Sequence, residues 1–323
     1  MNEGSLVLPR LKIALQMDPI ERVNVNADTS FDLALEAFGR GHEISIYPPA
    51  ALALSDGRVS ARAAKVLSLK REQGAHATLG EAEILDLHGV DIVLVRQDPP
   101  YDMAYVTACI ILEHLQPDVL VVNDPRSIRD APEKLFVARF PDLTPPTLIT
   151  RDAGRVRTFR EEHGDIILKP LYGNGGAGVF HLAADDSNFN AMIDLFLEAF
   201  AEPMIAQKYL PAVRAGDKRI ILLDGEAVGA INRVPARGET RSNLHVGGRA
   251  EAALMTARDQ EICDRIGPAL SERGLILVGI DVIGDHLTEI NITSPTGVQE
   301  IRRFGGPDIS ALFWDWAEGR LER

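Results

Sequence analysis

The first third of the chain alternates short apolar runs with segments of helical periodicity. The apolar runs predict strands at 11–18, 42–47, 91–96 and 118–124. The periodic segments predict helices at 29–41 and 102–115. Strands separated by helices form parallel βαβ units. Residues 48–90 show neither the pattern of a strand nor that of a helix clearly. A parallel N-terminal sheet is therefore predicted.

Beyond about residue 130 the pattern becomes richer in strands. Strands are predicted at 147–150, 165–170, 179–182, 204–210, 275–283 and 286–292, with a hairpin at 218–234 that turns at Asp224-Gly225. Helices are predicted at 133–140, 188–200, 257–274 and 308–322. The fold class is therefore α/β and α+β, with a parallel sheet first and a largely antiparallel body after it.

The predicted strand in HLTEINITSPTG (286–297) has one unusually polar face. Glu289, Asn291 and Thr293 alternate with apolar residues, and alternate side chains of a strand point to opposite faces. Asp281 on the preceding strand joins this face if the turn between the strands has an odd number of residues, and points away if the number is even. Oxygen donors of this kind suit Mg²⁺, but a solvated face of an antiparallel sheet has the same pattern.

A glycine-rich loop follows the strand at 165–170. Gly173, Gly175 and Gly178 match G-x-G-x-x-G, but a strand pattern follows at 179–182 where a dinucleotide-binding turn requires a helix. The loop is better interpreted as a flap between two strands, whose glycines let backbone N–H groups approach phosphates. An ordinary glycine-rich hairpin is the alternative.

Several cationic side chains stand where they could reach such a site. Lys169 ends the apolar strand before the glycine-rich loop, Lys134 lies in a short predicted helix, and Arg219 and Arg233 lie on the two strands of one hairpin. They could bind phosphate or carboxylate groups, although each taken singly could also be a surface residue. The polar segment 235–250 is either a surface loop or a lid over a substrate.

Composition narrows the function classes. The 323 residues are 46% hydrophobic and 25% charged, which is typical of a globular protein of two or three subdomains. The net charge of -13 argues against nucleic-acid and membrane partners. Cys109 and Cys263 lack C-x-x-C spacing and indicate reduced core thiols. Without a signal peptide or a membrane-spanning run, we expect a cytoplasmic protein with a flexible tail at 1–11.

Taken together, these segments resemble the bacterial glutathione synthetases, which are ATP-grasp ligases. The similarity extends from about residue 12 to the C-terminal helix. It rests on MDPIERVNVNADTSF, VRQDPPYDMAY, VVNDPRSIRDAPEKLF, DIILKPLYGNGGAGVF, QKYLPAVRAGDKR, INRVPARGETRSNLHVGGR and VGIDVIGDHLTEINITSPTG. The resemblance implies a pre-ATP-grasp substrate domain at 12–130 and an ATP-grasp domain at 131–323. The latter would divide into a lid subdomain at 131–209 and a metal-binding subdomain at 210–323.

The resemblance also implies a reaction and roles for residues. The reaction joins γ-glutamylcysteine to glycine and converts ATP to ADP and phosphate. Implied nucleotide-binding residues are Lys134, Lys169, Tyr172, Gly173, Gly175, Gly176, Gly178, Gln207, Tyr209, Leu210 and Asp217. Implied ligands of Mg²⁺, with Mn²⁺ as the alternative ion, are Asp281, Glu289 and Asn291. Implied substrate-binding residues are Arg219, Arg233, Ser294 and Thr296, and implied catalytic residues are Lys169, Arg219 and Arg233. A homo-oligomer is expected from the resemblance alone.

Other functions remain open from the residues themselves. Another carboxylate–amine ligase of the same fold would share the ATP-binding residues, and a non-catalytic ATP-binding module would keep the fold. An NAD-dependent oxidoreductase is disfavoured by the strand after the glycine-rich loop. The chain has no G-x-S-x-G motif and no reactive-cysteine context. Activation of the substrate as an acyl phosphate, rather than attack by a protein nucleophile, is therefore expected.

Overall fold

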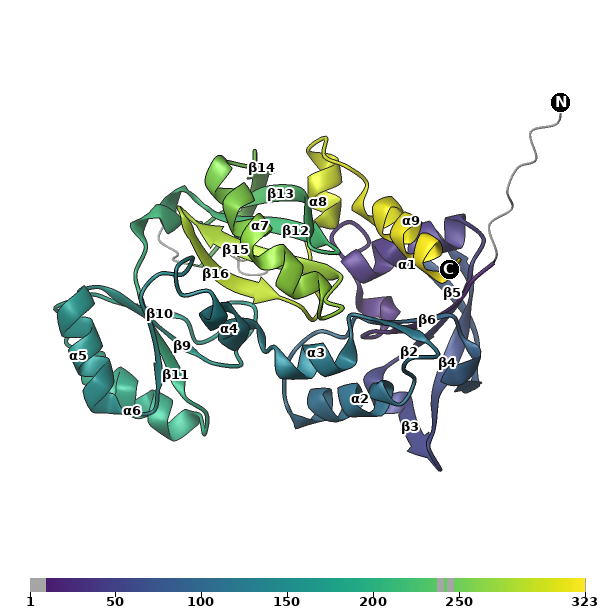
Figure 1. Cartoon of the computed structure of the whole chain (residues 1–323), viewed down its shortest axis with the longest axis horizontal. Helices are drawn as coiled ribbons and strands as arrows, with labels where there is room; N and C mark the ends of the chain where they lie inside the picture. Colours follow the sequence, from purple (N-terminus) through teal and green to yellow (C-terminus); the bar gives the residue numbers. More distant parts are fainter. Residues whose placement is uncertain (1–9, 237–240, 243–246, 323) are drawn as a thin grey trace.

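The computed structural model describes residues 10–236, 241–242 and 247–322, whose strands form three sheets (Figure 1). The first sheet has a parallel centre in the order β2-β1-β6-β7. Its strands are β1 (Lys12–Gln16), β2 (Glu43–Tyr47), β6 (Ile92–Val95) and β7 (Leu120–Val122), and its helices are α1 (Thr29–Gly39), α2 (Met103–Glu113) and α3 (Pro125–Asp130). The predicted parallel sheet is confirmed.

Residues 48–90 extend this sheet with antiparallel strands. They form β3 (Leu52–Ser55), β4 (Arg58–Leu69) and β5 (Ala77–Asp86), and β4 pairs with β2, β3 and β5. Most side chains of β5 are exposed or half-buried, so this strand has no buried face to impose a period of two. The first sheet is therefore mixed rather than purely parallel.

The second sheet forms a separate lobe, at the left of Figure 1. Its order is β10-β9-β11-β8, and every pairing is antiparallel. Its elements are β8 (Thr147–Thr150), α5 (Ala153–His163), β9 (Ile166–Pro170), β10 (Phe180–Leu182), α6 (Phe189–Ala199) and β11 (Met204–Lys208). The lobe has its own core, in which Val156 of α5 and Ile193 and Phe196 of α6 pack on Leu168 and Ala206 of the sheet. The short α4 (Glu133–Phe136) precedes it.

The third sheet is antiparallel in the order β14-β13-β12-β15-β16. Its strands are β12 (Asp217–Leu223), β13 (Glu226–Val234), β14 (Arg249–Ala252), β15 (Leu277–Ile283) and β16 (His286–Asn291). Its helix is α7 (Ala257–Ser271), followed later in the chain by α8 (Val298–Arg303) and α9 (Ile309–Leu321). The hairpin turn at Asp224-Gly225 lies where it is predicted.

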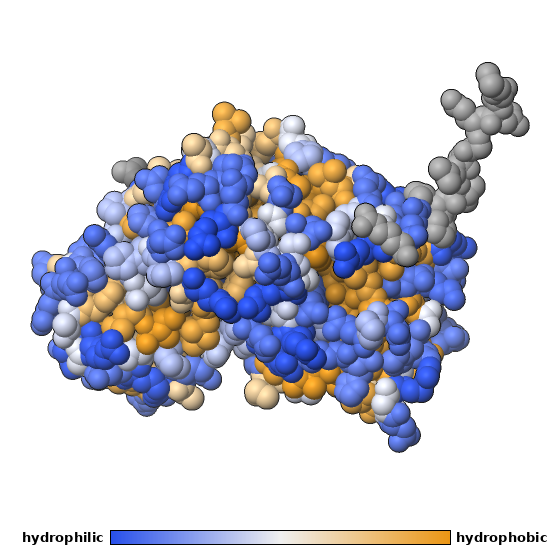
Figure 2. Space-filling view, in the orientation of Figure 1, coloured by the Kyte–Doolittle hydropathy of each residue, from blue (hydrophilic) through white to orange (hydrophobic). Residues whose placement is uncertain are grey.

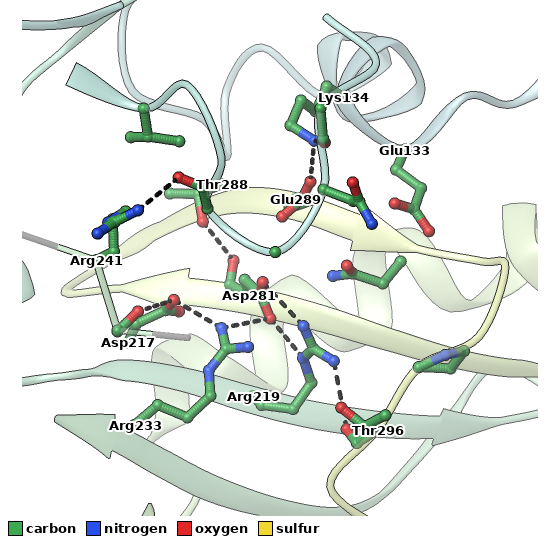
Figure 3. Close-up of a pocket in the computed structure, with 18 of the residues that line it drawn as sticks. Glu133, Lys134, Asp217, Arg219, Arg233, Arg241, Asp281, Thr288, Glu289 and Thr296 are labelled. Atoms are coloured by element: carbon green, nitrogen blue, oxygen red, sulfur yellow. Dashed lines mark hydrogen bonds and ion pairs between the residues drawn. The ribbon is translucent and has the colours of Figure 1, made fainter. Parts of the chain in front are cut away.

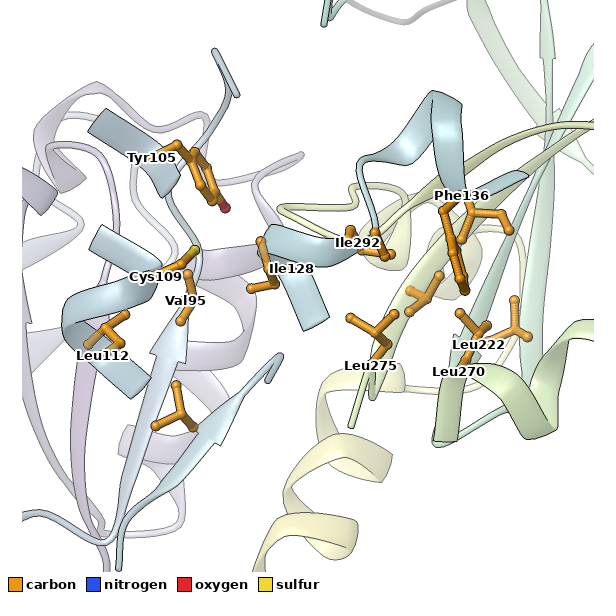
Figure 4. Close-up of a cluster of buried hydrophobic side chains, with 14 of the residues drawn as sticks. Val95, Tyr105, Cys109, Leu112, Ile128, Phe136, Leu222, Leu270, Leu275 and Ile292 are labelled. Carbon is orange, nitrogen blue, oxygen red and sulfur yellow. The ribbon is translucent and has the colours of Figure 1, made fainter. Parts of the chain in front are cut away.

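The first and third sheets share a continuous hydrophobic core. Figure 4 shows this cluster extending from Cys109 and Leu112 of α2, past Ile128 of α3, to Leu222 and Leu270 at the third sheet. The chain end also returns to the first sheet, because α9 lies beside α1 in Figure 1. These contacts fix the first sheet in place relative to the third.

Hydrophilic residues cover most of the face seen in Figure 2, with hydrophobic residues scattered between them. In the described part of the chain, no helix has the length and apolar character needed to cross a membrane.

Candidate active site

The three sheets surround a cavity of about 400 Å³. Its walls come from the N-terminus of α1 and the end of β6, from the glycine-rich loop after β9, and from β12, β13, β15 and β16. Predicted residues that line it are Lys134, Lys169, Gly173, Gly175, Gly176, Gln207, Tyr209, Leu210, Asp217, Arg219, Arg233, Asp281, Glu289, Asn291, Ser294 and Thr296. Residues far apart in the sequence thus meet in one place.

Two of the predicted nucleotide-binding residues are not among the lining residues. Tyr172 stacks on Tyr101, with ring centroids 5.7 Å apart, and is directed away from the cavity. Gly178 has φ +70 and packs against Pro170, where an added Cβ would lie 3.1 Å from the proline ring. This conformation lets the loop turn back into β10. Neither residue lines the cavity in this structure, and direct nucleotide contact by either one stays a prediction.

The polar face of β16 forms as predicted, but for a different reason. Asp281 pairs with Glu289, so the two side chains share a face. The turn between the strands, at Gly284 and Asp285, has an even number of residues, since Ile283 pairs with His286. The predicted odd-numbered turn is therefore wrong. A β-bulge at Thr288 shifts the register between Asp281 and Val282 and restores the shared face.

The two hairpin arginines converge on Asp281 (Figure 3). Arg219 Nε donates to Asp281 Oδ1 at 2.6 Å and its Nη2 donates to Oδ2 at 3.1 Å. Arg233 Nη2 lies 2.9 Å from Asp281 Oδ1 and donates to Asp217 Oδ2 at 2.6 Å. Burial works against the charge on Asp281, yet these two guanidinium groups hold its pKa well below the usual range. Burial, by contrast, raises the pKa of Asp217.

Lys134 lies against the polar face of β16. Its Nζ is 2.7 Å from Glu289 Oε1 and also donates to the carbonyl of Gly173. The preceding residue, Glu133, accepts hydrogen bonds from the backbone of Ile292 and from Thr293 Oγ1 at 2.9 Å. Glu133 was not predicted as a site residue. It attaches α4 to the end of β16 and so places Lys134 beside Glu289.

Lys169 is a half-buried cation on the cavity wall, without a close anionic partner among the described residues. Its Nζ donates to the neutral Gln207 Oε1 at 3.3 Å, while Gln207 Nε2 donates to Thr147 Oγ1 at 2.9 Å. Burial lowers the pKa of Lys169. A half-buried ammonium group with one long neutral contact is suited to an incoming anion such as a phosphate.

The glycine-rich loop is shaped by close packing on Pro170. A Cβ on Gly173 would lie 2.5 Å from Pro170 Cγ, which is closer than real Cβ contacts allow. Gly175 and Gly176 have φ of +59 and +80, a conformation that costs other residues energy. These glycines bring the loop backbone to the cavity beside Lys134.

Residues 207–210 end β11 and lead from the second sheet to the third, as a hinge would. The N–H groups of Lys208 and Tyr209 donate to the carbonyls of Pro146 and Asp165. Tyr209 also stacks on His181, with centroids 4.0 Å apart. Among the described residues the N–H of Leu210 has no backbone acceptor, so it is the hinge amide that can bond to an adenine ring.

Part of the predicted lid contacts the site. Ser242 Oγ donates to Asp217 Oδ2 at 2.6 Å, and Arg241 Nη1 donates to the carbonyl of Gly176 at 3.4 Å. The remainder of the predicted lid includes 237–240 and 243–246, which lie outside the described residues, as do residues 1–9 of the predicted tail.

The first sheet and its helices, here called the first lobe, contribute a buried arginine that the sequence pattern did not single out. Arg96 follows β6, donates through Nε to Ser30 Oγ at 3.1 Å and through Nη2 to the carbonyl of Pro295 at 3.1 Å. Ser294 Oγ donates to the carbonyl of Arg96 at 3.3 Å. Polar residues at the carboxyl ends of parallel strands commonly line ligand sites, and this signal could have identified Arg96.

The donor set of β15 and β16 fits a hard divalent cation. Glu289 and Asp281 supply carboxylate oxygens and Asn291 supplies an amide, the ligand types that Mg²⁺ and Mn²⁺ prefer. The Asn291 Nδ2 is buried without a partner among the described residues and could donate to a phosphate oxygen, whereas Asn291 Oδ1 is the atom that would hold a cation. The described chain has no group of three or more His, Cys, Asp or Glu residues arranged for a metal, so phosphate and water oxygens would complete the ligand set.

Comparison with known proteins decides among the ligases that this cavity would fit. The prokaryotic glutathione synthetase N-terminal domain model matches residues 11–129, and the prokaryotic glutathione synthetase ATP-grasp domain model matches residues 133–306. The chain belongs to the prokaryotic glutathione synthetase family. The predicted ATP-grasp fold and the predicted class of ATP-dependent ligase are thereby confirmed.

Individual glutathione synthetases align with nearly the whole chain. The protein of Brucella melitensis biotype 1 is 59% identical over 310 residues, which is 96% of this chain and 99% of the relative. That of Mesorhizobium japonicum is 58% identical over 311 residues, with the same two coverages of 96% and 99%. A crystal structure of a D-cycloserine synthetase is similar in fold, with a TM-score of 0.67 at 15% identity over 96% of this chain and 99% of that one.

Proposed function

We propose that this protein activates the cysteinyl carboxylate of γ-glutamylcysteine with ATP and that glycine then attacks the acyl phosphate. Family membership supports the assignment of the overall reaction, which yields glutathione, ADP and phosphate. The order of steps and the residue roles are supported by one observation above all. A single cavity brings Lys134, Lys169, Arg219 and Arg233 together with the oxygen donors of β15 and β16.

The first step transfers the γ-phosphoryl group to the substrate carboxylate. A carboxylate oxygen forms a bond to the γ-phosphorus, the bond from that phosphorus to the β,γ-bridging oxygen breaks, and ADP leaves. Lys169, Arg219 and Arg233 spread the transferring negative charge. The N–H groups of the glycine-rich loop and Lys134 hold the phosphates, and Leu210 binds the adenine ring. Mg²⁺, or Mn²⁺, supplies positive charge to the phosphates when it is held by Asp281, Glu289 and Asn291.

The second step forms the amide bond. The glycine amine attacks the acyl carbon, phosphate leaves, and the surplus amine proton is released. Residues 294–296 lie between Arg96, which contacts Ser294 and Pro295, and Arg219, which donates to the carbonyl of Thr296. They would bind the peptide substrate there. Closure by the glycine-rich loop and by 241–242 would keep water from the acyl phosphate. No protein nucleophile takes part.

The test is ADP and glutathione formation by the purified protein with ATP·Mg²⁺ while the acceptor pair is varied. We expect one glutathione for each ADP with γ-glutamylcysteine and glycine, and little product when D-alanine pairs or other dipeptides replace them. Equal rates with unrelated acceptors would contradict the proposal. A homo-oligomer that acts in the cytoplasm, where ATP is available, remains a further proposal from family membership, and light scattering tests the assembly.

A further inference from the structure

Tyr172, the first residue of the glycine-rich loop, points out of the cavity and contacts the first lobe. Its ring stacks on Tyr101 with centroids 5.7 Å apart and planes inclined by 25°. Tyr172 lies between β9 and β10 of the second sheet, whereas Tyr101 lies between β6 and α2 of the first. The two rings therefore connect separate sheets across the edge of the site.

Tyr101 is a firmly positioned partner. Its hydroxyl donates to the carbonyl of Arg129 at 2.6 Å, at the C-terminal end of α3. Its ring also lies 5.5 Å from the ring of Tyr105, which is buried in the shared core. Asp98 and Pro99, a short distance before it in the same segment, line the cavity. A change in this segment on substrate binding would thus reach Tyr101 directly.

Tyr172 is in turn bonded to a residue that contacts the proposed phosphate-binding lysine. Gly173 follows it, lines the cavity, and accepts a hydrogen bond from Lys134 through its carbonyl. Gly173 packs closely on Pro170, because a Cβ at this position would lie 2.5 Å from Pro170 Cγ. The position of the Tyr172 ring therefore influences where the start of the loop lies over the phosphates.

We propose that the Tyr101–Tyr172 stack is a positioning contact that holds the glycine-rich loop closed and couples ATP binding to γ-glutamylcysteine binding. This inference rests on the proposed function. When the stack is intact, the dipeptide orders the first-lobe segment and the loop together, so each ligand tightens the other by the same factor. When it is broken, the loop opens more often and water attacks the acyl phosphate, which returns γ-glutamylcysteine and phosphate without forming glutathione.

The size of the effect follows from the contact. In addition to the area that it buries, a stacked aromatic pair contributes enough free energy to change an equilibrium constant by about 2- to 12-fold. The exposed fraction of Tyr172 is 36%, so its replacement should leave the fold intact. Tyr172→Phe keeps the ring and should behave as the wild type. Phe304→Ala is a matched control, because Phe304 is 41% exposed and lies outside the cavity.

The experiment compares wild type, Tyr172→Ala, Tyr172→Phe, Tyr101→Leu and Phe304→Ala in two assays. The first is the ratio of ADP to glutathione formed at saturating substrates. The second is the factor by which γ-glutamylcysteine tightens binding of the β,γ-imido analogue of ATP, measured by titration calorimetry without turnover. We expect Tyr172→Ala and Tyr101→Leu to raise the ratio above one and to reduce the binding factor by about 2- to 12-fold, whereas the other two variants match the wild type.

The outcomes separate this inference from the proposed function. If the wild type makes glutathione but Tyr172→Ala keeps both the wild-type ratio and the wild-type binding factor, the inference is wrong and the function stands. If Tyr172→Phe fails as badly as Tyr172→Ala, a stacked ring is not what matters, and the inference is again wrong. If the wild type itself makes no glutathione, the proposed function fails before the variants are compared.

Discussion

Replacing Lys169 with methionine should stabilise the protein while removing most of its activity. Lys169 is half-buried on the cavity wall, and its contact with Gln207 is a 3.3 Å hydrogen bond to a neutral oxygen. The nearby carboxylates of Glu289 and Asp281 already bind Lys134 and Arg219. The ammonium group therefore carries a desolvation cost that the surrounding carboxylates offset only in part, and its lowered pKa reflects this cost.

The expected gain in stability is modest and has a definite sign. Replacing buried ionic groups by apolar ones of similar volume often stabilises a protein by about 1–4 kcal/mol, and leaving Gln207 Oε1 without its donor costs about 1 kcal/mol. We therefore expect the free energy of unfolding to rise by about 1–2 kcal/mol. Loss of one preorganised charge at the phosphates should cost about 2.7–4 kcal/mol in the transition state, or 10²–10³-fold in kcat.

The pH dependence provides a second test of the same cause. A lysine whose pKa is lower in the folded protein binds fewer protons there than in the unfolded chain. The penalty is then complete below the folded pKa and disappears as the pH rises toward the unfolded value near 10.4. The difference in stability between Lys169→Met and wild type should therefore be largest near neutral pH and shrink in alkali.

Urea unfolding followed by circular dichroism measures the stability, and steady-state kinetics with ATP measures the activity. Lys208→Met, on the exposed end of β11, is the control for stability and should change it by less than about 0.5 kcal/mol. A Lys169→Met protein that is less stable than the wild type by more than the control, or that retains wild-type kcat, would refute the reasoning.

Three further substitutions probe the walls of the cavity. Glu289→Gln should abolish turnover with an unchanged circular dichroism spectrum, and a near wild-type rate at ordinary Mg²⁺ would show that this face is merely solvated. Gly173→Ala should raise KM for ATP by about tenfold, a shift worth ~1.4 kcal/mol, because its Cβ would meet Pro170 at 2.5 Å. Gly39→Ala, which meets nothing within 4 Å, should leave KM unchanged, and equal KM values for the two variants would count against the steric argument. Asp281→Asn should lower the free energy of unfolding by about 3–5 kcal/mol in urea titrations, since it leaves two buried guanidinium groups poorly paired; a loss below 1 kcal/mol would contradict that role.

Elements with a buried, regular pattern could be predicted from the sequence, whereas elements without one could not. The strands β1, β6 and β7 are apolar runs with nearly all side chains buried, and their parallel arrangement follows. Helix α5 was missed because Val156 is its one buried side chain and its sequence is strongly polar. Strand β5 was missed for the corresponding reason, since most of its side chains are at least partly exposed.

The candidate site could be predicted in its residue types but not in its pairings. The period of two on β16 placed Glu289 and Asn291 on one face, yet the relation of Asp281 to them depended on a bulge at Thr288 that no local signal indicates. The resemblance implies that Tyr172 binds the nucleotide as part of the glycine-rich loop. Its actual contact is with Tyr101, a residue 71 positions earlier, and such long-range contacts depend on how the sheets pack.

Positional isotope exchange tests the central claim most directly. ATP labelled with ¹⁸O in the β,γ-bridging position is incubated with the protein, Mg²⁺ and γ-glutamylcysteine, with glycine left out. Reversible transfer to the substrate carboxylate lets the β-phosphate of bound ADP rotate, so the label should move to non-bridging positions, and it should not move when the dipeptide is omitted. Scrambling without the dipeptide, or recovery of the γ-phosphoryl group in covalent linkage to the protein, would contradict the acyl phosphate.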